Sequence, residues 1–188
     1  MRKGLKFLLI ADAFASLALG MVGPIYAIFV EEIGGDILDA SSAFFVFMLT
    51  SGIVMYLISR WEDKVKHKER LVTLGYALTA LGAFSYIFVY NQATLLVTQV
   101  ILGLSMAFLS PAYDALYSHY VRKDEETSEW GTWEAMGYIV GAFAALLGGY
   151  IASGFGFKSL FFLMFVFSLA GTFVSLNLFR DPKYLNSP

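Results

Sequence analysis

The chain has 188 residues, of which 58% are hydrophobic, 17% aromatic and 15% charged, and its formal net charge is −2. A soluble domain has about 25% charged residues and could not bury this much apolar surface in one core. The composition therefore excludes disordered, collagen-like and nucleic-acid-binding proteins and indicates a membrane protein. The sequence has no cysteine, which excludes disulfides, thiolate metal ligands and cysteine nucleophiles.

Six apolar segments follow one another along the chain, each close to the ~20 residues that a helix needs to cross a bilayer. The predicted transmembrane helices cover residues 7–30, 41–59, 71–90, 93–118, 131–153 and 159–179. The third and fourth helices are separated by Asn91 and Gln92, and the fifth and sixth by a short turn at Gly154 to Gly156. These segments predict an all-α membrane protein with six transmembrane helices.

The first helix has an alternative interpretation. Arg2 and Lys3 precede an apolar run that reaches small residues near Gly20, which resembles a cleaved signal peptide. The apolar run continues to Val30, however, and this length favours a membrane span.

The basic residues indicate how the helices are oriented. Twelve of the 13 Lys and Arg residues fall in segments that would face one side of the membrane: Arg2, Lys3, Lys6, Arg60, Lys64, Lys66, Lys68, Arg70, Arg122, Lys123, Arg180 and Lys183. Only Lys158 falls on the other side. The positive-inside rule then predicts a multi-pass protein of the cell membrane with both termini in the cytoplasm.

The segment lengths also suggest an internal repeat. We expect residues 1–188 to form a single domain of two three-helix repeats, covering residues 7–90 and 93–179. Pro24 and Pro111 occur at similar positions in the first helix of each repeat. Because three is an odd number, the repeats would be inverted in the membrane, which is typical of secondary transporters whose broken helices line a midplane site. The alternative is that these prolines only kink their helices.

Two acids lie inside predicted helices. By helix rise, Asp12 is ~8 Å and Asp114 ~9 Å from the cytoplasmic helix ends. A charge at the bilayer centre costs ~2.5–3.5 kcal/mol, so such residues usually face an interior or a watery cavity. We expect both acids to face one cavity and one of them to bind and release a proton during transport. The alternative is that each reaches water or caps a neighbouring helix end.

Several other residues could contribute to the same cavity. Gln99 is an uncommon uncharged polar side chain for a membrane helix, and Tyr117 lies one helical turn from Asp114. The candidate residues of the substrate or proton pathway are therefore Asp12, Asp114, Gln99, Tyr113, Tyr117, Tyr26, Pro24 and Pro111. An aromatic and weakly acidic lining favours amphipathic or cationic solutes.

The fifth predicted helix is rich in small residues. Spacing by four puts Gly137, Gly141 and Gly149 on one face, and Gly148 lies beside it. Such a face allows two helix backbones to approach closely. We expect a tight packing seam within the chain; a dimer contact is the alternative.

Enzyme and metal signatures are missing from the sequence. It contains no H-E-x-x-H, G-x-S-x-G, Walker or G-x-G-x-x-G motif, so we expect neither an enzyme nor a bound cofactor. His67 and His119 are the only histidines and lie in or beside the predicted loops, so we expect no metal site.

Several motifs, in order, resemble those of the N-terminal six-helix half of major facilitator superfamily transporters. Residues 59–68 look like the family's G-x-L-a-D-R-x-G-R-R/K loop, with Asp63, Lys64 and Lys68 at its charged positions. The resemblance implies that this segment is a cytoplasmic gating loop. Residues 99–111 are similar to the R-x3-G-x3-G-x3-P motif, with Gln99 where the family has an arginine tied to proton coupling.

Two further segments complete the resemblance. Residues 144–149 resemble the antiporter motif G-P-x-x-G-G, keeping the double glycine but not the Gly-Pro, and residues 154–161 look like the G-W-R-W-x-F turn. The resemblance implies a secondary active transporter that moves a small molecule by alternating access. Antiport and efflux are favoured by the double glycine, and proton coupling by the buried acids.

Transporters of this family have twelve or more helices, with the site between two six-helix halves. A lone half would expose Asp12, Asp114 and Gln99 to lipid, which is unfavourable. We therefore expect a half-size transporter that works as a homodimer or with a second six-helix half. The alternatives are a non-transporting membrane interaction subunit and a fragment of a full-length transporter.

Overall fold

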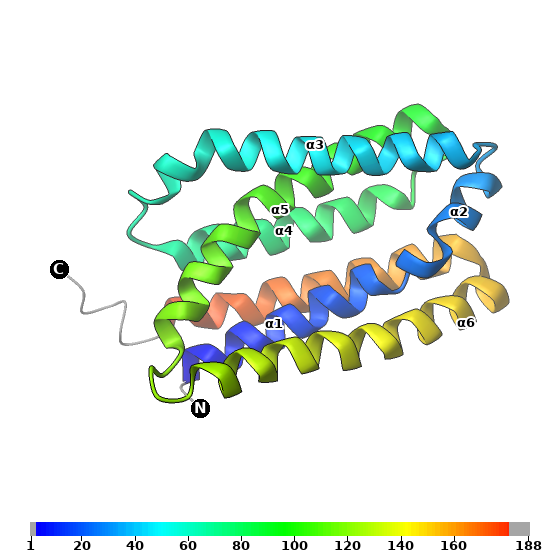
Figure 1. Cartoon of the computed structure of the whole chain (residues 1–188). Coiled ribbons are helices and arrows are strands. Elements are labelled where there is room, and N and C mark those ends of the chain that lie inside the picture. Colours follow the sequence, from blue (N-terminus) through cyan, green and yellow to red (C-terminus); the bar gives the residue numbers. More distant parts are fainter. Residues whose placement is uncertain (1–2, 181–188) are drawn as a thin grey trace.

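The computed structural model describes residues 3–180, which are helical throughout, with no strand among them (Figure 1). In chain order the elements are α1 (Lys3–Gly20), the 3-10 helix η1 (Gly23–Ile25), α2 (Tyr26–Glu32), α3 (Ile37–Glu62), α4 (Lys68–Tyr86), α5 (Gln92–Tyr120), α6 (Glu126–Ser175) and the 3-10 helix η2 (Leu176–Arg180). The helices lie roughly along one direction and form an elongated bundle (Figure 1). The all-helical prediction is confirmed for the described residues.

The two ends of the bundle collect different segments. The start of α1, the α3–α4 loop, the α5–α6 loop and the end of η2 lie at one end (Figure 1). The α2–α3 turn, the α4–α5 turn and the bend at Gly156 lie at the other (Figure 1). We call the first the basic end, because the loops that carry Arg60 to Arg70 and Arg122 to Lys123 are there. Lys158 belongs to the opposite, far end.

The first predicted helix, residues 7–30, is broken where its proline lies. α1 ends at Gly20, and Pro24 stands in the first turn of η1. A proline lacks the backbone N–H, and its ring clashes with the carbonyl four residues earlier, which here belongs to Gly20. Pro111, in contrast, lies inside the continuous helix α5. Only one of the two prolines therefore breaks its helix.

Side-chain caps determine where two of the helices begin. Asp36 accepts hydrogen bonds from the backbone N–H groups of Leu38 and Asp39, and the Asp39 carboxylate accepts one from the Asp36 N–H. This capping box starts α3 four residues before the predicted 41. Asn91 caps α5 in the same way, which confirms the predicted break before the fourth helix.

α6 is two helical arms joined at Gly156. This residue has φ 79° and ψ 167°, a conformation that favours glycine, and the chain reverses there (Figure 1). The arms correspond to the predicted helices 131–153 and 159–179. Their ends differ from the prediction, since the first arm begins at Glu126 and α6 ends at Ser175.

Four helical stretches are long and apolar enough to cross a membrane: residues 3–32, 37–62, 92–120 and 126–179. The last contains 54 residues, about 80 Å of helix at 1.5 Å per residue, against a hydrocarbon core of about 30 Å. α4 has 19 residues, of which the first three are charged, and is not among the four. The length and apolar character of these stretches make the chain a multi-pass membrane protein.

Close packing between α1 and α6 differs from the predicted glycine seam. A Cβ on Gly148 would overlap the Met21 carbonyl oxygen, and one on Gly20 would lie 2.9 Å from the Ala144 Cβ. Around Gly137, Gly141 and Gly149, in contrast, an added Cβ would meet no atom within 4 Å. The residues of α6 that approach Gly20 and Met21 are therefore Ala144, Gly148 and Gly141, whose Cα lies 3.8 Å from a Cβ built on Gly20. The packing face thus includes part of the predicted seam, whereas a Cβ on Gly137 or Gly149 would meet no described atom within 4 Å.

Candidate functional site

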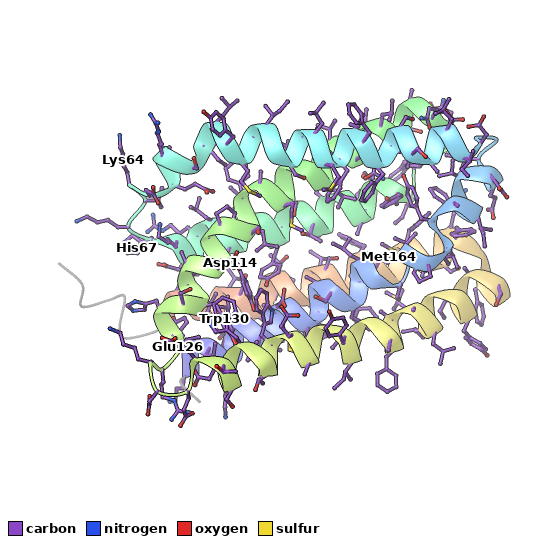
Figure 2. All side chains as sticks on the ribbon, viewed as in Figure 1. Lys64, His67, Asp114, Glu126, Trp130 and Met164 are labelled. Atoms are coloured by element: carbon purple, nitrogen blue, oxygen red, sulfur yellow. The ribbon has the colours of Figure 1, made fainter. Side chains whose placement is uncertain are left out.

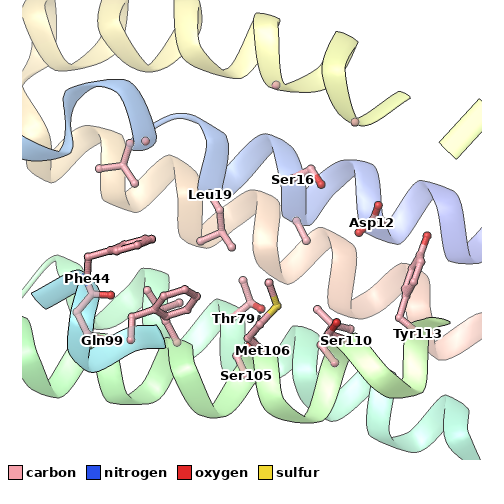
Figure 3. Close-up of a pocket in the computed structure, with 18 of the residues that line it drawn as sticks. Asp12, Ser16, Leu19, Phe44, Thr79, Gln99, Ser105, Met106, Ser110 and Tyr113 are labelled. Atoms are coloured by element: carbon pink, nitrogen blue, oxygen red, sulfur yellow. Dashed lines mark hydrogen bonds between the residues drawn. The ribbon is translucent and has the colours of Figure 1, made fainter. Parts of the chain in front are cut away.

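The described chain has an open pocket of about 750 Å³ between α1, α3, α4, α5 and the first arm of α6. Figure 3 shows Asp12, Ser16 and Leu19 on α1 across from Ser105, Met106 and Ser110 on α5. No Lys, Arg or His side chain is among the residues that line it. The pocket therefore combines an apolar wall with two carboxylates and several neutral polar groups.

Asp12 and Asp114 line the same pocket but have different surroundings. Asp12 is half-buried, and its Oδ2 accepts a hydrogen bond of 2.7 Å from the indole Nε1–H of Trp133. Asp114 is exposed and makes no hydrogen bond or ion pair within the described chain. Asp12 is thus held in place, whereas Asp114 is free to turn.

An aromatic cluster borders Asp12. Tyr113 packs against Trp133 with ring centroids 5.3 Å apart and stacks on Tyr117 at 6.0 Å. Trp130 packs against Tyr117 at 4.7 Å. These rings come from α5 and α6 and exclude water from one side of the carboxylate. Figure 3 shows Tyr113 beside Asp12 at this end of the pocket, which we call the acid end.

The opposite end of the pocket carries an amide. Gln99 is 5% exposed, and its Nε2 donates to the hydroxyl of Tyr26 at 2.8 Å and to that of Tyr86 at 3.0 Å. Both amide hydrogens are therefore used within the chain. Figure 3 places Gln99 near Phe44, far from Asp12, and we call this the amide end.

Between the two ends, α4 and α5 are joined by a buried pair of hydroxyls. The Thr79 and Ser105 oxygens lie 2.6 Å apart, and both lie within hydrogen-bond distance of the Gly75 carbonyl oxygen, at 3.1 and 2.8 Å. Because each hydroxyl has one hydrogen, one of them donates to the other, and the other donates to the Gly75 carbonyl. These bonds hold the α5 wall against α4 and satisfy polar groups that lipid could not.

Three predicted pathway residues do not line the pocket: Tyr117, Pro24 and Pro111. The Tyr117 hydroxyl donates to the Glu129 carbonyl and connects α5 to the start of α6. Pro24 acts through the break between α1 and α2, which places Tyr26 at the pocket wall.

The predicted gating loop lies at the basic end, remote from the pocket. Asp63 and Lys64 are exposed, and neither makes an ion pair within the described chain. Lys68 Nζ donates to the Glu62 carbonyl at 3.1 Å. Figure 2 shows Lys64 and His67 extending from this end. Two buried acids that the sequence analysis did not single out, Glu62 and Glu69, flank the loop. Glu69 pairs with His67 at 2.9 Å, whereas the Glu62 carboxylate has no hydrogen-bond partner within the described chain.

Sequence reasoning missed the partners of the pocket's polar groups. Trp133, Tyr86, Thr79 and Ser105 each complete a hydrogen bond there. A tryptophan near a helix end commonly sits at the membrane interface, and only the packing of α1 on α6 turns its indole toward Asp12. A polar residue in an apolar span is the signal that could have identified Thr79 and Ser105.

The described residues contain no group of His, Asp and Glu side chains arranged to hold a metal ion. The lining of the pocket provides apolar contact, neutral hydrogen-bonding groups and two carboxylates that attract positive charge.

The sequence of the chain is similar to those of known proteins. The Major Facilitator Superfamily model matches residues 8–188. An uncharacterized MFS-type transporter of Bacillus subtilis (strain 168), YuxJ, is 29% identical over 165 residues. The match covers 82% of this chain and 40% of the relative, so the chain spans less than half of that transporter.

Proposed function

Because the chain belongs to the major facilitator superfamily of transporters, we propose that it is a secondary active transporter half that moves a small molecule through the central pocket. The observation that carries this proposal is one pocket between the helices that is lined by two carboxylates and by no Lys, Arg or His side chain. The family match by itself shows that the chain is a member of a transporter family.

The proposed topology has six membrane spans, with both termini in the cytoplasm of the cell. The positive-inside rule supports it, because the basic loops share one end of the bundle. In this proposal each arm of α6 is a span, and α4 is another despite its charged first turn.

The packing of the helices supports an inverted repeat. If the three helices of each repeat correspond in order, every contact between the repeats should have an equivalent contact. A contact of the first helix of repeat one with the second helix of repeat two is then matched by a contact of the first helix of repeat two with the second helix of repeat one. The two third helices would contact one another. Gly20 of α1 approaches Ala144 in the first arm of α6, and Gly103 of α5 approaches Thr50 of α3. Phe84 of α4 meets Phe165 in the second arm at 5.0 Å. These are the expected pairs.

A second half, either another copy of this chain or a different six-helix partner, would complete the site. Asp114 is exposed in the described chain, and a carboxylate facing lipid is costly. Large apolar side chains of α3 beside the pocket are exposed as well, including Phe44 at 58%. A partner that covers this face would enclose the pocket and allow access from alternating sides of the membrane.

The proposed substrate is an amphipathic cation, and the proposed direction is export by exchange for protons. The acid end would attract the positive charge, while the apolar wall and the rings of Tyr26 and Tyr113 would hold the rest of the molecule. Asp12 is the proposed proton carrier, because a substrate cation and a proton would compete for its carboxylate.

Flux through proteoliposomes tests this function. The purified chain should move a lipophilic cation such as tetraphenylphosphonium when a proton gradient is imposed, and a neutral analogue of equal size should move much more slowly. Protein-free vesicles and a collapsed gradient are the controls. Absence of flux under every gradient would favour a non-transporting interaction subunit.

The pairing is tested separately, because a transporter half could fail to move the chosen probe. Cross-linking in membranes should trap a dimer through the face that carries the pocket. Recovery of monomers alone, in membranes that contain no other half, would contradict a homodimer.

A further inference from the structure

A second groove runs along the outer side of α1 and the first arm of α6, away from the central pocket. It has a volume of about 750 Å³ and is lined by Lys6, Leu9, Ile10, Ala13, Phe14, Leu17, Thr132, Met136, Val140 and Phe143. None of these residues lines the central pocket. The groove is therefore a separate site, for which the transport mechanism gives no role.

The length of the groove along the helix axes is close to the thickness of the hydrocarbon layer of one leaflet of a bilayer. Its lining on α1 extends over twelve residues, from Lys6 to Leu17, and its lining on α6 extends over twelve, from Thr132 to Phe143. From the first to the last of twelve residues a helix rises about 16 Å, and half of the hydrocarbon core is about 15 Å. The two helices run in the same direction from the basic end, so both stripes start at the same depth (Figure 1).

The polar groups of the groove are all at one end. Lys6 is its only charged lining residue and Thr132 its only hydroxyl, and both lie nearest the basic end. Lys6 is exposed and makes no ion pair within the described chain. Lys3 is exposed one helical turn away. The remaining lining is apolar, and Phe143 and Ile10 are 68% and 45% exposed.

We propose that this groove binds an anionic phospholipid of the leaflet at the basic end, with one acyl chain lying between α1 and α6 and the phosphate at Lys6. A ligand with one charged end and an apolar shaft one leaflet long matches the groove in polarity and in length. The free ammonium of Lys6 supplies the charge complementarity, and Thr132 can accept a hydrogen bond from a headgroup hydroxyl. The lipid would hold α1 beside the arm of α6 that carries Trp133.

Native mass spectrometry of the full chain tests this site. The protein is titrated with phosphatidylglycerol or with phosphatidylcholine of the same acyl chains, and the retained lipid is counted. The wild-type chain should retain phosphatidylglycerol in preference. Lys6→Gln should lower this preference about fivefold, the amount expected for one base near the membrane surface. Lys158→Gln, which removes the base at the far end, should leave it unchanged.

A bulky substitution inside the groove tests whether an acyl chain binds there. Ala13→Phe places a ring in the middle of the groove and should reduce retention of both lipids, whereas Ala135→Phe, on the exposed surface of the same arm of α6, should not. Circular dichroism and size exclusion check that each variant is folded. If Ala13→Phe does not fold, the Lys6→Gln comparison still decides the proposal.

Three results would overturn the inference. The first is an unchanged lipid preference in Lys6→Gln. The second is full competition by glycerol phosphate, which has the headgroup chemistry without the acyl chain. The third is a disulfide-linked dimer of Phe143→Cys in membranes, because the wild-type chain has no cysteine and such a bond would place a second copy over the groove. None of these results depends on whether the central pocket transports a cation.

Discussion

Each end of the central pocket holds one polar side chain of an apolar helix, a carboxylate at the acid end and an amide at the amide end. Asp12 lies twelve residues before Pro24, and Gln99 lies twelve residues before Pro111, so the two would occupy corresponding positions in the first helix of each proposed repeat. Each is held by aromatic side chains. The Asp12 carboxylate accepts from the indole of Trp133, and the Gln99 amide donates to the hydroxyls of Tyr26 and Tyr86.

The difference between these ends separates two roles. An amide stays neutral at every physiological pH, whereas a carboxylate can take up a proton or attract a cation. Only the acid end could therefore exchange charge in the proposed transport cycle. The amide end can position a substrate, since its tyrosine hydroxyls still have hydrogens to donate.

The largest expected effect is that of Asp12→Asn. Asparagine keeps the shape and can still accept from Trp133, but it cannot carry a proton, so proton-driven flux should fall at least about tenfold (~1.4 kcal/mol). Substrate exchange without a gradient should persist with a weaker apparent affinity, because the amide also removes the negative charge that attracts the cation. Proteoliposome flux with and without a pH gradient makes the measurement, and a wild-type rate of driven flux would remove Asp12 from the proton pathway.

Trp133→Phe should come next. The ring remains in the aromatic cluster, but Asp12 loses its donor, and a hydrogen bond to a charged group contributes about 1.5–3 kcal/mol. We expect thermal unfolding at a lower temperature and weaker cation binding. Trp130→Phe is the matched control, because Trp130 lies in the same cluster and makes no hydrogen bond to Asp12. Equal effects of the two variants would show that ring packing alone matters.

Gln99→Leu tests the amide end. It removes two hydrogen bonds, and interhelical bonds in membranes average about 0.6 kcal/mol each, so the loss of stability should be about 1 kcal/mol. Substrate binding should weaken while the response to a proton gradient is kept. Gln92→Leu removes the contacts to α3 outside the pocket and should change stability without changing binding. Loss of proton coupling in Gln99→Leu would contradict the division of roles.

The smallest effect should be that of Asp114→Asn. Asp114 makes no hydrogen bond or ion pair within the described chain, so its replacement leaves no partner group unsatisfied, and driven flux should change about twofold (~0.4 kcal/mol) or less. Titration of flux against substrate concentration should show a change in apparent affinity only. A loss of driven flux as large as that of Asp12→Asn would show that Asp114 also belongs to the proton pathway and would contradict the smaller role given to it.

Residue types and their spacing were sufficient to predict most of the elements. The Asn91 cap, the turn at Gly156 and the apolar runs are local features, and each was visible in the sequence. The position of α4 was harder to predict, because its first turn carries three charges and its apolar character is lower than that of the other helices. The prolines looked equivalent, but only Pro24 breaks its helix.

The sequence by itself determined that this chain is a helical membrane protein of a transporter family, because hydrophobic run length, basic-loop placement and motif order are properties of the chain alone. It also marked Asp12, Asp114 and Gln99 as unusual. The tertiary structure decided which face of α6 packs on α1 and which donors reach each polar group. That choice depends on contacts between residues far apart in the chain, such as Asp12 with Trp133, and no local spacing encodes them.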